Sequence, residues 1–336
     1  MQLPPSTTVM SSLSPTACIQ PNPDISGIGV RVSIYAQAFL SLVPLAIFAM
    51  DGEITLEESL AINDIVMTNE LTACALLVSA IIQARTYGLS TYHANIVLVL
   101  SWITFVPCMA TAYFGPVLNR KLMESQSEAD MKFRKRVAWK LHLRGLVVWV
   151  HYIAVAGLGI WVWSDVKTFG SQPDCTPRTF VLIFGYNIPV TNQGLRVVAL
   201  YLYGSFALSA AIVPVYIPFM QYRQRRRARR APPRPESPSD VDSYTRNRRE
   251  KRNMRTWCFV LLLAAGTEIL FVASTEVLIT RSKGLVQSGE SQWTFGQSLA
   301  VFLVLIPLVS TIGELQKGYE ELREKRKREP LQPREA

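Results

Sequence analysis

Residues 258–274 read CFVLLLAAGTEILFVAS, a run of seventeen residues in which Glu268 is the only charged side chain. Two more runs share this character: WVHYIAVAGLGIWVW at 149–163 and SLAVFLVLIPLVSTI at 298–312. A helix needs about 20 predominantly apolar residues to cross the hydrocarbon core of a bilayer. These three runs, with their apolar flanks, therefore predict membrane-spanning helices.

The composition of the whole chain agrees with that prediction. Of 336 residues, 49% are hydrophobic and only 18% are charged, and the mean hydropathy is +0.19. These values exclude a disordered chain, a collagen-like chain and a secreted disulfide scaffold. The net charge of +10 would suggest nucleic-acid binding, but most Lys and Arg residues lie in a few segments between apolar runs. We therefore predict a membrane protein without a nucleic-acid partner.

With four further apolar stretches, these runs predict an all-α bundle of seven transmembrane helices, with no soluble domain. Residues 1–27 form an N-terminal tail, 28–313 the membrane domain and 314–336 a charged tail. The second span is the weakest, because its uninterrupted apolar core is only 71–82, and a re-entrant segment is an alternative there. The predicted spans are about 28–50, 63–84, 92–115, 141–163, 195–219, 257–280 and 293–313.

The distribution of basic residues predicts the orientation of the bundle. With seven spans, 27 of the 35 Lys and Arg residues fall on the side that holds the C-terminal tail, and five fall on the other side. Cytoplasmic segments are the ones enriched in Lys and Arg. We therefore expect the N-terminus outside and the C-terminus in the cytosol, in the plasma membrane rather than an internal membrane.

The loop at 164–194 and the N-terminal tail carry two features of the outer side. The run TFVLIFG at 179–185 favours a short strand or hairpin. The loop could be a lid over the outer side of the bundle, and an ordinary loop is the alternative. Cys18 and Cys175 are the two cysteines outside the spans, and an oxidising compartment permits a disulfide between them. Two unpaired thiols are the alternative.

The basic segment 220–256 has a net charge of +9 and is rich in Arg, Pro and Ser, so we expect it to be disordered. One interpretation is a cluster that only fixes the topology. The other is a site, within 221–255, for anionic lipids or an acidic cytosolic partner, since each engaged basic residue contributes about 1 kcal/mol. Ser237 and Ser239 are candidate phosphosites that would offset this charge. The tail from Glu314 predicts a short helix before Pro330.

Three stretches resemble a group of fungal multi-pass membrane proteins. They are NPDISGIGVR at 22–31, YGLSTYHANIVLVLSW at 87–102 and FVLIFGYNIPVTNQGLR at 180–196. The resemblance covers the membrane part and the outer face but not the basic segment. It implies a shared architecture and carries no activity, ligand or residue role.

The predicted topology is also similar to that of G-protein-coupled receptors, which is weak evidence for function. The third span ends TAYFGPVLNR, without an acidic-Arg-aromatic triplet, and the seventh reads LIPLVSTIGEL, without an Asn-Pro-x-x-Tyr run. The seventh span also has no Lys for a retinal Schiff base.

Ionisable residues inside spans are energetically unfavourable, so by default they indicate a functional site. Glu268 lies near the centre of the sixth span and His151 near the centre of the fourth, so the two could pair. Such a pair could relay a proton or bind a cation, or it could be a structural hydrogen bond between helices. Glu276 lies closer to the outer end of the sixth span, and Glu70 lies in the inner half of the second.

A second set of polar and aromatic residues falls in the outer half of the spans, where it could line a pocket for a small-molecule ligand. Tyr and Trp also form interfacial belts, which is the alternative for the aromatic members. We expect one member, Arg31, to extend to the headgroups or to pair with Asp24. The set is Arg31, Tyr35, Gln37, Tyr92, His93 and Asn95.

The chain lacks the phosphate-binding, GxSxG and HExxH motifs, and its three histidines are dispersed, so we predict no enzyme, cofactor or metal site. A receptor or sensor with an outward-facing pocket is the preferred function. An ion- or proton-coupled transporter or channel that uses Glu268 and His151 is the alternative. A membrane scaffold is the second alternative.

Overall fold

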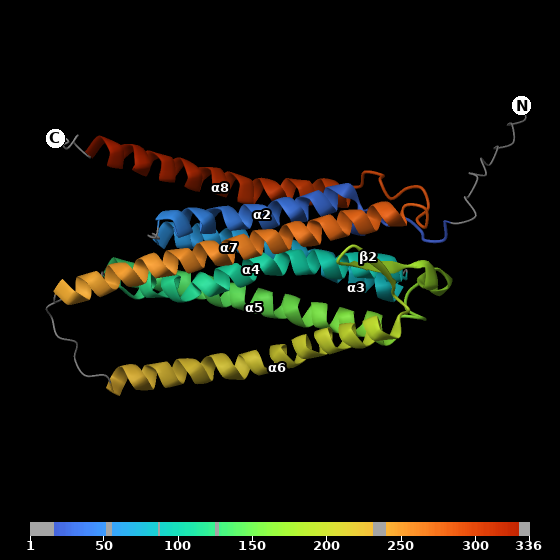
Figure 1. Cartoon of the computed structure of the whole chain (residues 1–336), viewed down its shortest axis with the longest axis horizontal. Coiled ribbons are helices and arrows are strands. Elements are labelled where there is room, and N and C mark those ends of the chain that lie inside the picture. The colour runs from blue at the N-terminus through green and yellow to red at the C-terminus, as the bar shows by residue number, and fades with distance from the viewer. Residues whose placement is uncertain (1–16, 52–55, 87, 125–127, 231–239, 329–336) are drawn as a thin grey trace, which may run out of the picture.

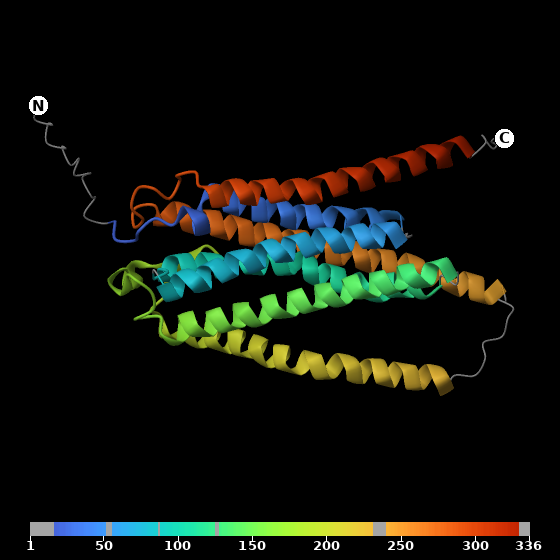
Figure 2. The ribbon, with the colours of Figure 1, turned by 180° about the vertical axis from the view of Figure 1, so that it is seen from behind.

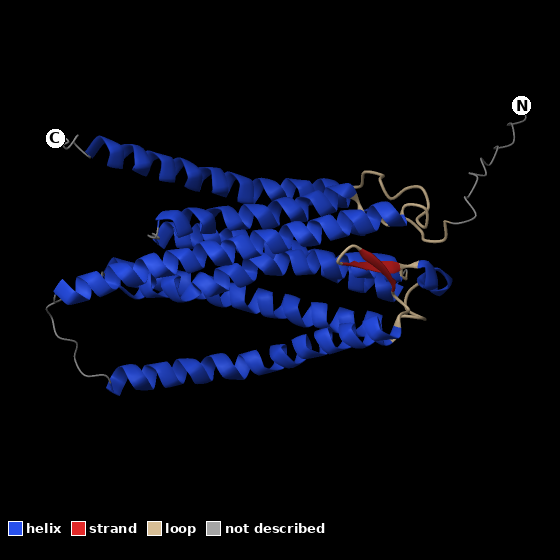
Figure 3. Ribbon diagram, in the orientation of Figure 1, coloured by secondary structure: helices blue, strands red, loops and turns tan. Residues whose placement is uncertain are grey.

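The computed structural model describes residues 17–51, 56–86, 88–124, 128–230 and 240–328. Within these ranges it is all-helical apart from one two-stranded sheet, as the sequence predicts (Figure 3). The long helices are α2 (Ile28–Asp51), α3 (Leu56–Thr86), α4 (Thr91–Glu124), α5 (Glu128–Ser164), α6 (Gln193–Arg230), α7 (Asp240–Ser282) and α8 (Phe295–Arg328). The short elements are α1 (Pro23–Ser26), the 3-10 helix η1 (Pro173–Arg178), and the strands β1 (Phe180–Ile183) and β2 (Tyr186–Pro189).

Among the described residues, seven helical segments are long and apolar enough to cross a membrane, which confirms the predicted number. The second span belongs to the continuous helix α3, so it is not a re-entrant segment. The segments are Pro23–Ile47, Leu60–Thr86, Thr91–Tyr113, Trp139–Ser164, Gln193–Pro214, Met254–Ser282 and Phe295–Gly313.

The centre of the bundle is formed by α2, α3 and α4, each of which contacts the other two. On this centre α8 packs against α2 and α3, α7 against α2 and α4, and α5 against α3. Helix α6 runs along α5 at the edge of the bundle (Figures 1 and 2). Accordingly, 67% of the apolar stretch of α4 is buried, against 17% in α6 and in α7. Most of the α6 and α7 surface is thus left for lipid.

Three loop segments gather at one end of the bundle, and we call them the cap. They are residues 17–22 before α1, 165–192 before α6 and 283–294 before α8 (Figure 1). The opposite end of the bundle, where α6 and α8 end and α5 and α7 begin, is called the far end.

The cap contains the hairpin that the sequence predicts within 164–194. Phe180 of β1 lies opposite Pro189 of β2, and Ile183 opposite Tyr186. The two turn residues, Phe184 and Gly185, both have positive φ, at 48° and 86°. That combination is the type I′ turn, whose twist matches that of the strands.

The three segments of the cap are cross-linked. Cys18 and Cys175 form a disulfide with their Cα atoms 5.9 Å apart, so the structure has the paired state rather than two free thiols. The next residue, Ile19, pairs with Val286 in a short parallel bridge. The N-terminal segment is therefore bonded to both of the other loops.

A close helix contact positions α8 on α2. The backbone N–H of Gly29 donates to the Gln297 side-chain oxygen at 2.9 Å. A Cβ atom at Gly29 would lie 2.7 Å from the Gln297 Cβ, which is too close for any larger residue. Small residues let membrane helices approach each other closely.

At the far end the helices extend beyond the predicted spans. Helix α6 continues to Arg230 and α7 begins at Asp240, so the expectation of disorder across 220–256 is wrong for these flanks. Arg, Lys and Ala are good helix formers, and a helix already nucleated in the membrane extends at little cost. Helix α8 likewise continues to Arg328, as predicted for the tail. Ser237 and Ser239 lie outside the described residues.

Candidate functional site in the bundle interior

A layer of buried polar side chains crosses the middle of the bundle. Its members come from five helices, and each has an exposed fraction of 4% or less. Lipid offers no hydrogen bonds, so each of these groups needs a partner inside the protein. The layer includes Gln37, Asn69, Glu70, Thr104, His151 and Glu268.

Glu268 lies at the centre of the Met254–Ser282 span. It belongs to the buried stripe of α7, whose other members include Ala264, Thr275 and Leu278. Since α7 packs on α2 and α4, this stripe points Glu268 into the bundle. Both of its carboxyl oxygens are buried, and neither has a hydrogen-bond partner among the described residues. An unpaired buried carboxylate is strongly unfavourable, so this group is suited to bind a proton or a cation.

The structure pairs His151 with Glu70, not with Glu268. The Nδ1 atom of His151 lies 2.7 Å from Oε2 of Glu70, and both side chains are 0% exposed. The imidazole stacks on Phe105 of α4, with the ring centroids 4.6 Å apart and the planes 13° from parallel. Glu268 is at a matching depth but on α7, whereas His151 faces α3, because α5 packs on α3. The other oxygen of Glu70 and Nε2 of His151 are buried without a partner in the described part of the chain.

Two amides complete the layer. The Thr72 hydroxyl lies 3.0 Å from the Gln37 side-chain oxygen, which links α3 to α2. The Gln37 amide nitrogen has no acceptor among the described residues. The Asn69 amide nitrogen lies 3.5 Å from the Thr104 carbonyl oxygen, at the limit of a hydrogen bond. Helix α3 thus carries polar groups at this depth toward α2, α4 and α5.

A second polar cluster lies nearer the cap, between α2 and α7. Arg31 and Glu276 form an ion pair, and the Arg31 Nε also donates to the Ser26 carbonyl oxygen at 2.8 Å. The Tyr35 hydroxyl donates to the same Glu276 oxygen at 2.9 Å. Arg31 therefore neither extends to the headgroups nor pairs with Asp24, because its guanidinium is bound by Glu276 of α7. The sequence of the first span alone could not predict this partner.

Glu290 of the cap connects the loop before α8 to α4 and to the N-terminal segment. Its Oε1 lies 3.0 Å from Nε2 of His93, and its Oε2 accepts the backbone N–H of Asn22 at 2.7 Å. The other ring nitrogen of His93 lies 2.7 Å from the Ser90 hydroxyl. Every polar atom of the His93 ring is therefore engaged, and the cap is bonded directly to α4.

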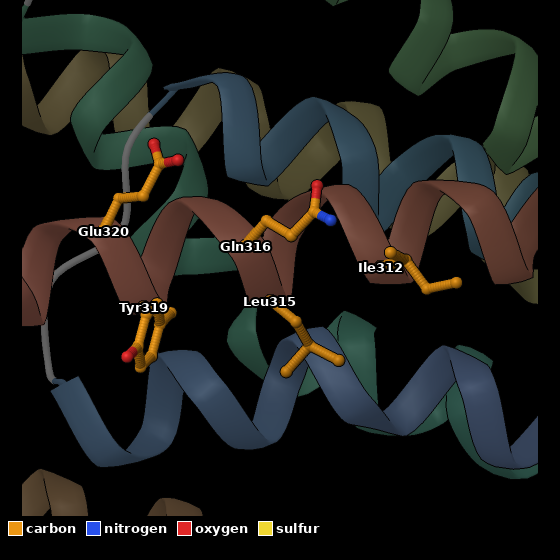
Figure 4. Close-up of a pocket in the computed structure, with 5 residues that line it drawn as sticks. All are labelled: Ile312, Leu315, Gln316, Tyr319 and Glu320. Carbon is orange, nitrogen blue, oxygen red and sulfur yellow. The ribbon is translucent and has the colours of Figure 1, made fainter.

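The residues of the predicted outer pocket are mostly buried. Tyr92 is 2% exposed, and Asn95 bonds back to the Thr91 carbonyl oxygen of its own helix at 2.8 Å. Two surface hollows stand out, and neither is lined by any of the six predicted residues. One is the shallow hollow at the far end of α8, lined by Ile312, Leu315, Gln316, Tyr319 and Glu320 (Figure 4). All five residues come from α8, so no second helix closes the hollow and it is an open groove on the surface.

Glu290, Asn63 and Arg144 are among the residues of this region that the sequence did not single out. Glu290 lies in a loop and has no pattern that marks it. Asn63 and Arg144 did carry a signal, since they precede Glu70 and His151 by seven residues each. The side chains of Arg144 and Asn63 meet, with Nη1 3.5 Å from Oδ1. A shared spacing of polar residues on two spans could have indicated their pairing.

Comparison with known proteins does not identify the class of this protein, so the class follows from the fold and the site alone. Within the described residues, no group of three or more His, Cys, Asp or Glu side chains could hold a metal ion. No family model matches the chain, and no curated protein or solved structure matches it either. The seven apolar helices define an integral, multi-pass membrane protein. The resemblance to fungal multi-pass proteins stays a prediction.

Proposed function

We propose that the protein binds a proton or a small cation in the middle of the membrane and acts as a proton- or cation-coupled transporter or channel. One observation carries this proposal: Glu268 is fully buried at the centre of its span, and both of its oxygens lack a partner among the described residues. Intramembrane carboxyls of this kind mark ion pathways and proton relays. The buried Glu70–His151 pair lies in the same layer and supports the proposal.

Flux through proteoliposomes tests this function. Purified protein is reconstituted with a pH-sensitive dye inside, and proton and Na⁺ or K⁺ movement is recorded under an imposed voltage. Glu268→Gln should lower the flux about tenfold or more, which corresponds to about 1.4 kcal/mol in a rate-limiting barrier. Glu320→Gln is the matched control, because Glu320 is an exposed residue at the far end of α8. Equal flux in Glu268→Gln and the wild type would contradict the proposal.

A receptor or sensor is the second candidate, and the bonding of the cap favours it. Glu290 joins the cap to α4, and Glu276 joins α7 to α2 just below the cap. A ligand that moved the cap would therefore move these helices. Spin labels at the far ends of α6 and α7 provide the test: Glu290→Gln, which releases the cap from His93, should change their spacing. Unchanged spacing, with intact folding, would count against this candidate.

We further propose that the cap faces outside, at the plasma membrane, and that the far end faces the cytosol. Two independent features support this orientation. The disulfide of the cap requires an oxidising compartment, and the far end carries most of the Lys and Arg. Modification of a glycosylation acceptor placed within 231–239 would refute it.

The basic residues of 221–255 give the far end a further proposed role, as a contact for anionic lipids or an acidic cytosolic partner. Both flanks of this segment are helical, since α6 continues from its span to Arg230 and α7 begins at Asp240 before its span. Attachment of this kind weakens with salt and with phosphorylation at Ser237 and Ser239. A scaffold that acts only through this segment is the remaining alternative. It predicts that Glu268→Gln has no effect on any function.

A further inference from the structure

The α3–α5 interface contains polar pairs at a regular spacing. Asn63 meets Arg144, and seven residues further along both helices Glu70 meets His151. A seven-residue spacing on both partners is the pattern of helices that pack along one continuous seam. Each step of seven residues rises about 10 Å along the helix. The two pairs are therefore successive contacts of one seam that leads from the far end to the middle of the bundle.

The exposure of these pairs decreases along the seam. At the far end Lys140 Nζ lies 2.8 Å from Asp64 Oδ2, and these side chains are 47% and 53% exposed. The Asn63–Arg144 contact is partly buried. The Glu70–His151 pair is 0% exposed. The seam is thus a file of polar groups that begins in solvent and ends in the middle of the bundle.

A thiol fills the interval between the last two pairs. Cys108 of α4 is 3% exposed, and its thiol interacts with both Arg144 and Glu70. Glu70 also interacts electrostatically with Cys74 on α3 itself. Polar groups therefore recur from Asn63 through Cys108 to Glu70, beside the buried Val66 of α3.

Beyond His151 the seam becomes apolar. The next positions at the same spacing are Leu77 on α3 and Leu158 on α5, which are 1% and 2% exposed and belong to the main hydrophobic core. Leucines at this point separate the Glu70–His151 pair from the cap. The pair can therefore be reached along this seam from the far end only.

From this arrangement we propose that the α3–α5 seam is a proton path from the far end to the Glu70–His151 pair. This inference rests on the proposed function and deepens it. A proton held on the Glu70 carboxyl passes to His151 Nδ1, so that the O–H bond breaks and an N–H bond forms. The Nε2–H proton leaves at the same time for a water molecule on the side of the ring away from Glu70. Glu70 ends as a carboxylate and the imidazole ends neutral, which moves one proton across the ring.

The free atoms of the pair fit this role. His151 Nε2 and Glu70 Oε1 are both buried without a partner in the described chain, so each remains available for the incoming or the outgoing proton. An imidazole with one nitrogen bonded to a carboxylate and the other one free is a common proton shuttle. The stacked Phe105 ring holds the imidazole plane in this position.

Thiol labelling tests the path in the full-length protein. With Cys74→Ser and Cys258→Ser, Cys108 is the remaining free thiol, since Cys18 and Cys175 are joined. The probe is the membrane-impermeant reagent 2-(trimethylammonium)ethyl methanethiosulfonate, added to one face of reconstituted protein. Cys108 should react from the far end and about tenfold or more slowly from the cap. Equal reaction from both faces, faster reaction from the cap, or no reaction would overturn the path.

A blocking substitution separates this inference from the proposed function. Asn63→Leu should lower both the far-end labelling of Cys108 and the Glu268-dependent proton flux by about tenfold. Thr68→Leu is the control, because Thr68 lies on α3 and its hydroxyl bonds to the Asp64 carbonyl oxygen of the same helix. Full flux in Asn63→Leu would overturn the path and leave the proposed function standing. One-sided labelling without flux in the wild type would refute the proposed function and leave the path.

Discussion

The Glu70–His151 pair gives the sharpest test of how the bundle is held together. His151→Leu removes the 2.7 Å contact to Oε2 of Glu70, whose other oxygen has no hydrogen-bond partner among the described residues. Truncating one partner of a buried ion pair costs about 3–5 kcal/mol in soluble proteins, whereas hydrogen bonds between membrane helices average roughly 0.6 kcal/mol. The pair is 0% exposed, but it is a single contact. We therefore expect His151→Leu to lower the free energy of unfolding by about 2–4 kcal/mol.

Thermal unfolding in detergent, followed by circular dichroism, measures this loss as a fall in Tm of roughly 5–10 °C. His142→Leu is the matched control, since it makes the same substitution on an exposed position of the same helix. The double variant Glu70→Leu/His151→Leu should be less destabilised than the sum of the single variants, because neither polar partner is left unpaired. If the effects simply add, or if His151→Leu costs no more than His142→Leu, the pair does not hold α5 to α3.

Three further outcomes follow from other contacts. Cys18→Ser removes the disulfide of the cap and should cost about 2–5 kcal/mol, so that a reducing agent lowers the Tm of the wild type but not that of the variant. Gly29→Ala should destabilise by about 1–3 kcal/mol because its Cβ would collide with α8, whereas Gly266→Ala, with no atom within 4 Å of its Cβ, should be neutral or stabilising in the same melting experiment. Arg281→Ala removes the hydrogen bonds to the Gly185 carbonyl oxygen in the hairpin turn and to the Asn187 side chain of β2, so limited proteolysis within 180–189 should speed up without a change in Tm.

The amino-acid sequence alone predicted the class of the fold and the depth of the key residues. Seven apolar runs of about 20 residues leave few other possibilities, because a backbone in lipid must satisfy its own hydrogen bonds as a helix. The same reasoning placed Glu268 and His151 near mid-span, since position along a helix follows from residue number. It also indicated the hairpin, from the β-branched and aromatic run bounded by turn residues.

The partners of these residues could not be predicted in the same way. The sequence matched His151 in depth with Glu268 and placed Glu70 in the inner half of the second span, but depth does not say which helix lies beside α5. Packing placed α3 there, so the partner is Glu70. Arg31 likewise bonds to Glu276, which is distant in sequence and on α7.

The sequence by itself thus determined how many helices cross the membrane and how deep each polar residue lies, because both depend on local hydrophobicity and on a constant rise per residue. Only the tertiary structure decided which faces meet, since the neighbours of a helix depend on the shapes of all the others. It paired Glu70 with His151, left Glu268 without a partner among the described residues, and bonded His93 of the predicted outer pocket to Glu290 of the cap. The physical reason is that every helix is apolar on most sides, so hydrophobicity does not distinguish the lipid-facing side from the packed one.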